Sequence, residues 1–121
     1  MALLDDYKKF LSERGKSENT IKTYSGHVNE YYRWYKDTFG EELTLLYHTN
    51  ILDFRSYLQN IKKLKFKSID TKLSSLTNFN EFLVQIGVQK DLVITAEDRL
   101  KFQQDIASPA EIEKKDVEAF L

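Results

Sequence analysis

Apolar side chains recur at spacings of three and four along four separate stretches of this chain, and that period constrains its fold more than any other feature. The cleanest stripe, within residues 18–39, consists of Ile21, Tyr24, Val28, Tyr31 and Tyr35. Such spacing places side chains on one face of an α-helix, whereas strand residues alternate. Sandwiches and barrels need frequent Gly and Pro turns, and the chain has four Gly and one Pro. The sequence therefore predicts an all-α fold, a small four-helix orthogonal or antiparallel bundle.

Capping signals give the expected bounds of the four helices. Glycines 15, 40 and 87 follow three of the stripes, and glycine commonly ends helices because it adopts the left-handed conformation without strain. The predicted helices cover residues 2–14, a second stretch from 18 or 20 to 39, residues 51–62, and a fourth stretch from 67 or 68 to 86. Short polar side chains can cap or open the later three, and the candidates are Ser17 or Asn19, then Asn50, then Lys67 or Ser68.

The apolar faces of these helices predict the core. The third helix contributes Ile51, Phe54, Leu58 and Ile61, and the fourth Ile69, Leu73, Leu76, Phe79, Phe82, Leu83 and Ile86. An aromatic cluster in the second helix comprises Tyr31, Tyr32, Trp34 and Tyr35. Aromatic clusters can stack on single-stranded bases, but this one shares the spacing of the apolar stripe. We therefore expect it to pack in the core.

The chain beyond residue 90 is expected to have a different organisation. Residues 91–107 are polar and weakly periodic after a short apolar run, so we predict a linker there. Ser108, Pro109 and Glu111 form a capping box with proline at the first helical position, which predicts the start of a further helix over residues 108–121. That helix would stop in the middle of its apolar pattern, and we expect the natural protein to continue.

The charge is unevenly distributed along the chain. The formal net charge of −1 argues against nucleic acid as a partner, since its binders are usually basic. Residues 1–90, however, hold 14 Lys and Arg against 11 Asp and Glu, whereas residues 91–121 hold 4 against 8. The first 90 residues are therefore modestly basic, and any DNA affinity should be weak and sensitive to salt.

Several classes of site are missing from the sequence. The chain has no Cys, so it has no disulfide, thiolate metal site or cysteine nucleophile. No signal peptide and no apolar run of membrane-spanning length occurs, and we expect a cytoplasmic protein. His27 and His48 have no partner at metal-ligand spacing and are expected to be surface or hydrogen-bonded residues. We predict no catalytic residue, no metal and no cofactor.

Two polar helix starts carry a family resemblance. One is the run from Ser17 to Tyr24, with Phe10-Leu11 before it and Tyr32-Arg33-Trp34-Tyr35 after it; the other runs from Ser68 to Leu76 and precedes Phe79, Phe82-Leu83 and Gly87. Together they resemble the two signatures of the N-terminal core-binding (SAM-like) domain of phage-integrase-family tyrosine recombinases. Where that family often has Asn-Pro, this chain has Gln89 to Leu92, so the exact end of the domain differs.

The resemblance implies a DNA-binding domain over residues 1–90, a linker over 91–107 and the start of the catalytic domain over 108–121. In this family the bundle is half of a C-shaped clamp on double-stranded DNA, and the starts of the second and fourth helices face the duplex. The positions this implies are Asn19, Thr20, Lys22, Thr23 and Gly26, and Lys65, Lys67, Ser68, Thr71, Lys72 and Ser75. Recombination itself would need the nucleophilic Tyr of the catalytic domain, which these residues do not include.

The chemistry of these residues suits a phosphate backbone independently of the resemblance. Helix N-termini offer free N–H groups, lysines neutralise phosphates, and small polar side chains allow close approach. A solvated helix face would carry the same residues, so a helical protein-interaction module without DNA binding stays open as the alternative. A stand-alone enzyme is disfavoured because no catalytic set is present. We expect the piece to be a monomer in solution that meets other recombinase protomers when assembled on DNA.

Overall fold

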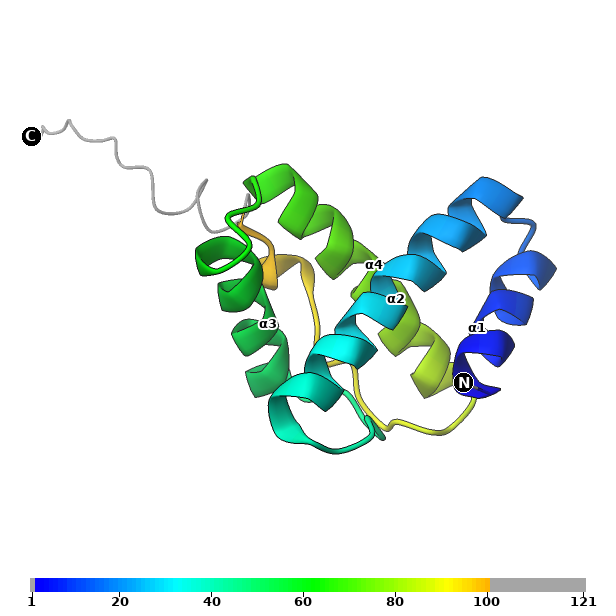
Figure 1. Ribbon diagram of the computed structural model, residues 1–121. Coiled ribbons are helices and arrows are strands. Elements are labelled where there is room, and N and C mark those ends of the chain that lie inside the picture. The colour runs from blue at the N-terminus through cyan, green and yellow to red at the C-terminus, as the bar shows by residue number, and fades with distance from the viewer. Residues whose placement is uncertain (1, 101–121) are drawn as a thin grey trace, which may run out of the picture.

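The computed structural model describes residues 2–100 and confirms the all-α prediction (Figure 1). Within that range there is no strand. The elements are α1 (Ala2–Glu13), α2 (Glu18–Phe39), α3 (His48–Asn60), α4 (Phe66–Gln85) and the short 3₁₀ helix η1 (Ala96–Asp98).

The ends of α2 follow the capping signals in the sequence. Ser17 is its N-cap, and the Ser17 hydroxyl accepts a hydrogen bond of 3.1 Å from the backbone N–H of Thr20. At the other end Gly40 adopts the left-handed conformation, with φ 73°, and its N–H donates to the carbonyl of Lys36. Of the two candidate caps, the helix uses Ser17 and not Asn19, and its predicted end before Gly40 is confirmed.

The predicted starts of α3 and α4 were wrong. The N-caps are Tyr47 and Lys65, neither of which makes a side-chain cap hydrogen bond, so Asn50 lies inside α3 and Ser68 inside α4. Helix α3 begins three residues earlier than predicted, and α4 begins one or two residues earlier. The added first residues His48 and Phe66 are exposed, and the first turn of α3 is tied down instead by the hydrogen bond between His48 and Asp98.

The core is formed by the predicted stripes with two exceptions. Tyr7, Tyr31, Phe54 and Phe79 are fully buried, and the rings of Tyr7, Tyr32 and Phe82 all surround Phe79. The aromatic cluster of α2 therefore packs inside the protein, as expected. Ile61 and Ile86 were predicted to be buried but are 71% and 46% exposed. Each is the first residue after its helix has ended, so the helical period no longer places it over the core.

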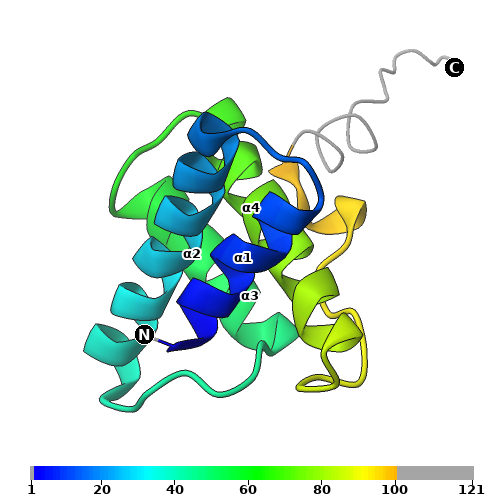
Figure 2. The ribbon, with the colours of Figure 1, turned by 90° about the vertical axis from the view of Figure 1, so that its right-hand side faces the viewer.

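The four helices are arranged so that α2 and α4 begin at the same end of the molecule. In Figure 1 both helices start at the top, α2 on the right and α4 on the left, and cross as they descend; Figure 2 shows the same two starts at the top from the side. Helix α1 ascends beside α2, and α3 ascends toward the start of α4. The turn between α1 and α2 and the connector between α3 and α4 thus lie at this same end.

Residues 91–100, the first part of the predicted linker, pack against the bundle. The buried side chain of Asn80 accepts a 2.7 Å hydrogen bond from the N–H of Val93, and Ile94 is 1% exposed. Asp98 is held by His48, whose Nε2 lies 2.7 Å from its carboxylate. Beyond residue 100, the rest of the expected linker and the expected helix over 108–121 lie outside the described residues.

Candidate nucleic-acid interface

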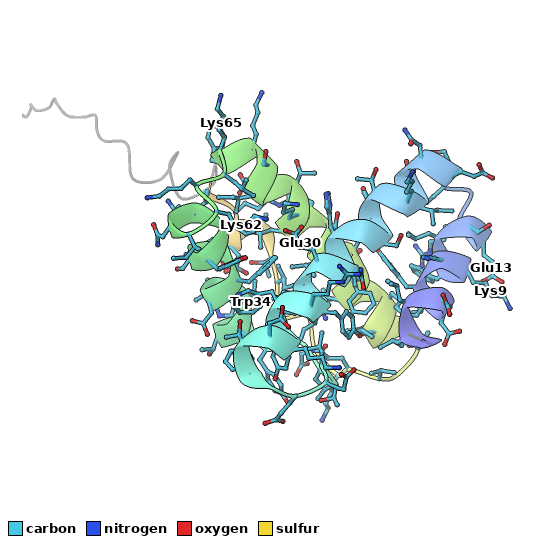
Figure 3. The ribbon with its side chains drawn as sticks, viewed as in Figure 1. Lys9, Glu13, Glu30, Trp34, Lys62 and Lys65 are labelled. Atoms are coloured by element: carbon cyan, nitrogen blue, oxygen red, sulfur yellow. The ribbon has the colours of Figure 1, made fainter. Side chains whose placement is uncertain are left out.

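The end of the molecule where α2 and α4 begin is strongly basic. We call this surface the basic face and define it as residues 14–23 and 61–72. It contains eight lysines and arginines and two carboxylates, in a chain whose formal net charge is −1. Figure 3 shows Lys65 reaching outward from the start of α4, away from the rest of the bundle. Folding therefore brings these basic residues together on one surface, although the net charge of the whole chain is negative.

The opposite end of α2 has the reverse charge. Residues 36–44, which follow the chain out of α2, contain Asp37, Glu41 and Glu42 against one lysine. That lysine, Lys36, pairs with Glu42 at 2.7 Å. An anionic polymer approaching the domain is thus attracted to the basic face and not to the far end.

On α2, four of the five predicted contact residues are exposed. Asn19, Thr23 and Gly26 are exposed along the first half of the helix. Thr20 is half-buried, and its hydroxyl oxygen accepts a 3.0 Å hydrogen bond from the Ser17 hydroxyl, so it belongs to the cap. Lys22 is exposed and lines a hollow between α1 and α2 at the edge of the basic face.

On α4, the first residues are exposed as predicted. Lys65, Lys67 and Ser68 are free of any recorded side-chain hydrogen bond, and Thr71 is exposed although its hydroxyl donates to the carbonyl of Lys67 at 2.8 Å. The lysines and the free N–H groups at the start of α4 thus face solvent together.

Two further predicted contacts on α4 have partners within the protein, and burial rules out one of them, Ser75. Ser75 is 0% exposed, and its hydroxyl lies 2.8 Å from Nδ1 of His27, so it joins α4 to α2 and no duplex can reach it. Lys72 is 19% exposed, and its ammonium lies 2.6 Å from the carboxylate of Glu30. Both residues point toward the crossing with α2, where the helical period turns residues 72 and 75 inward.

A polar hollow of about 360 Å³ lies beside this crossing, at the edge of the basic face. Seven residues line it: His27, Glu30, Lys62, Leu64, Ser68, Thr71 and Lys72. Burial lowers the pKa of His27, and the positive charge of Lys72 lowers it further. A neutral imidazole therefore shares the hollow with two lysines and one carboxylate.

The expectation that His27 and His48 are hydrogen-bonded residues is confirmed, since Ser75 and Asp98 are their partners.

Gly26 is unusual for a glycine in the middle of a long helix. An ideal Cβ built at this position would meet nothing within 4 Å, so packing inside the protein does not require glycine there. Glycine in a helix interior is roughly 1 kcal/mol less favourable than alanine. Its side-chain-free surface is exposed next to Asn29, Glu30 and Arg33, which line a second hollow of about 300 Å³ together with Lys62.

Four basic residues of this face were not among the predicted contacts: Arg14, Lys16, Lys62 and Lys63. The density of lysine in residues 62–67 was a usable signal for the connector. Nothing local indicated Arg14 and Lys16, because only the folded bundle places the turn between α1 and α2 at the same end as that connector.

Other kinds of site find no support in residues 2–100. No group of three or more potential ligands could hold a metal ion among them, and no helix there is both long and apolar enough to cross a membrane. Burial raises the pKa of Tyr32 to about 12 and raises those of Tyr7 and Tyr31 as well. These tyrosines are therefore core residues that resist ionisation.

Known proteins resemble this chain over its whole length. Residues 4–87 match the family model described as phage integrase, N-terminal SAM-like domain. Over 121 residues the chain is 42% identical to a protein of Bacillus thuringiensis named TnP I resolvase. That match covers 100% of this chain but 43% of the relative, so the chain spans less than half of its relative's length. No solved structure matches the chain.

Proposed function

The chain belongs to the phage integrase N-terminal SAM-like domain family, and from that premise we propose that it binds double-stranded DNA through its basic face. The duplex lies across the starts of α2 and α4. Lys65 and Lys67, with the connector lysines, neutralise phosphates, and Asn19, Thr23, Ser68 and Thr71 hydrogen-bond to the backbone or to base edges.

One observation carries this proposal: the exposed starts of α2 and α4 lie at the same end of the molecule, where eight basic residues outnumber two acidic ones. Two helix N-termini add partial positive charge to that of the side chains. A solvated surface with no ligand has no need for such segregation, since like charges on one surface repel each other.

We further propose that the domain serves a larger enzyme. With the fragment itself non-catalytic, the parent would be a DNA strand-breaking and rejoining tyrosine recombinase, and the name of its relative favours a resolvase. The domain would clamp the recombination half-site while a separate catalytic domain cleaves and rejoins the strands. It would act in the cytoplasm, as a monomer in isolation and beside other recombinase protomers on DNA.

A salt titration tests the proposal. Binding of the chain to a fluorescently labelled generic duplex is measured by anisotropy from 50 to 300 mM salt. We expect affinity to fall linearly on logarithmic axes, with a slope of about −0.9 for each phosphate neutralised. The variant K65A/K67A should reduce the slope by about 1.8, because it removes two phosphate contacts.

The control removes two lysines from elsewhere on the molecule. Lys9 lies on the outer side of α1 in Figure 3, and Lys90 follows the end of α4. The variant K9A/K90A has the same net charge as K65A/K67A and should bind with the slope of the unmodified chain. Equal losses in the two variants would mean that binding is not directed to the basic face.

A second candidate function is a protein-interaction module. The observation that favours it is a group of exposed apolar residues after α4, in which Ile86, Val88 and Leu92 are 42% to 51% exposed. Exposed apolar groups commonly mark protein contacts. No binding to DNA at 50 mM salt would favour this candidate over the first.

A further inference from the structure

Glu30 of α2 and Lys72 of α4 form a partly buried ion pair at the edge of the basic face. Their charged atoms are 2.6 Å apart, and the side chains are 29% and 19% exposed. The other lysine–glutamate pair of α2, Lys36–Glu42, is far more open, with side chains 65% and 71% exposed. Water therefore screens the charges of the Glu30–Lys72 pair less than those of the open pair.

The position of Glu30 is the unexpected part of this arrangement. It lines the polar hollow together with Lys62 and Lys72, and it is the one carboxylate among the seven lining residues. An incoming phosphate would be attracted by both lysines and repelled by Glu30. A carboxylate and a phosphate also compete for the same ammonium, since each is an oxygen anion that accepts its hydrogen bonds.

We propose that Glu30 is an internal competitor of DNA: it occupies the ammonium of Lys72 where a backbone phosphate would otherwise bind, and so limits the affinity of the basic face. This inference rests on the proposed DNA-binding function. Electrostatic affinity is independent of sequence and supplies nearly all non-specific binding. A lysine held by Glu30 does not contribute to it, so the domain depends more on its exposed contacts at the two helix starts.

The test is the variant E30Q in the salt titration described above. Glutamine keeps the shape of glutamate, and its amide oxygen can still accept a hydrogen bond from Lys72, but the negative charge is lost. We expect the slope to steepen by about 0.9 and binding at 0.1 M salt to tighten roughly eightfold, the effect of one additional phosphate contact. Equal binding by E30Q and the unmodified chain would overturn the inference.

E42Q is a matched control for E30Q. It also changes the net charge by +1 and also breaks a pair with a lysine of α2, but at the far end of that helix. It should leave both the slope and the affinity unchanged within about twofold. A gain in E42Q equal to that in E30Q would show a general effect of net charge and would refute a specific role for Glu30.

A double-variant comparison separates this proposal from direct binding by Lys72. If Glu30 and Lys72 neutralise each other in the bound state, E30Q/K72A should match the unmodified chain, and K72A alone should bind more weakly than both. If Lys72 already binds a phosphate, E30Q/K72A should lose about 0.9 from the slope, which overturns the proposal. The double variant leaves no unpaired charge at the crossing, so this comparison stands even if E30Q alone is unstable.

The two proposals fail in different ways. Absence of salt-dependent binding by the unmodified chain would refute the DNA-binding function itself. Binding that K65A/K67A weakens but E30Q does not strengthen would refute only the role of Glu30.

Discussion

Replacing Gly26 with alanine should make the protein more stable and its DNA binding weaker. Gly26 is the ninth residue of the 22-residue helix α2 and is exposed, and no atom lies within 4 Å of where a Cβ would be. Alanine therefore gains the full helix-propensity difference of about 1 kcal/mol without a steric penalty. For a domain of this size, 1 kcal/mol corresponds to a rise in melting temperature of about 4 °C or more.

The same methyl group should obstruct DNA. Gly26 lines the second hollow, to which Lys62 of the basic face also contributes. We expect the backbone of a bound duplex to approach the helix closely there, so an added side chain would obstruct it. We expect G26A to weaken binding roughly five- to tenfold, the equivalent of about 1 to 1.4 kcal/mol. The salt slope should stay the same, because no charged group has changed.

The assays are thermal or urea unfolding for stability and the anisotropy titration for binding. T38A is the control, since Thr38 is exposed in the last turn of α2 at the far end. It should also stabilise the helix slightly while leaving DNA binding intact. If G26A binds DNA as tightly as the unmodified chain, DNA does not approach α2 closely at this position. If G26A is less stable than the unmodified chain, the expected gain in helix stability is refuted.

Three further predictions follow from the interior. Because burial and Lys72 lower the pKa of His27 in the folded state, its stabilising neutral form is fully present above the unfolded pKa of about 6.5. The free energy of unfolding that depends on this neutral form is lost as the pH falls below 6.5 toward the lower pKa of the folded state. Urea unfolding at pH 7.5 and at pH 5 should therefore show a smaller loss of stability in H27N than in the unmodified chain. Equal losses in the two proteins would contradict the lowered pKa of His27. N80A should cost about 2 kcal/mol of unfolding free energy, because it leaves the N–H groups of Val93 and Ile94 without an acceptor, and a loss under 0.5 kcal/mol would contradict this. F79A should cost about 4 kcal/mol by the same measurement, as it empties the centre of the aromatic core, and retention of the original melting temperature would contradict it.

The helices and most of the core were predictable from the sequence because they depend on local information. The spacing of Tyr31, Phe54 and Phe79 within their stripes predicted their burial, and Ser17 and Gly40 predicted both ends of α2. The predictions failed where two local signals disagreed. Ile61 continued an apolar stripe after its helix had ended, and Asn50 offered a cap that the packed helix did not use.

The candidate interface was likewise predictable from the sequence only in part. Polar and basic residues at two helix starts were visible in the sequence, and Asn19, Lys65, Lys67 and Thr71 are exposed there. The sequence at a helix start shows which residue types are present there, but it does not show which of them a neighbouring helix covers. Ser75 has the same chemistry as Ser68, yet it is buried because α2 crosses α4 at that level.

The sequence by itself determined four amphipathic helices, their approximate ends and the presence of two polar helix starts. Only the tertiary structure decided that these starts share one end of the molecule, that Glu30 meets Lys72 at 2.6 Å, and that a chain of net charge −1 has a basic face. The physical reason is that these interactions act over different distances. Helical period and capping depend on residues a few positions apart in the chain, whereas charges interact through space. Which charges lie close together is therefore decided only when the core has fixed how α2 and α4 cross.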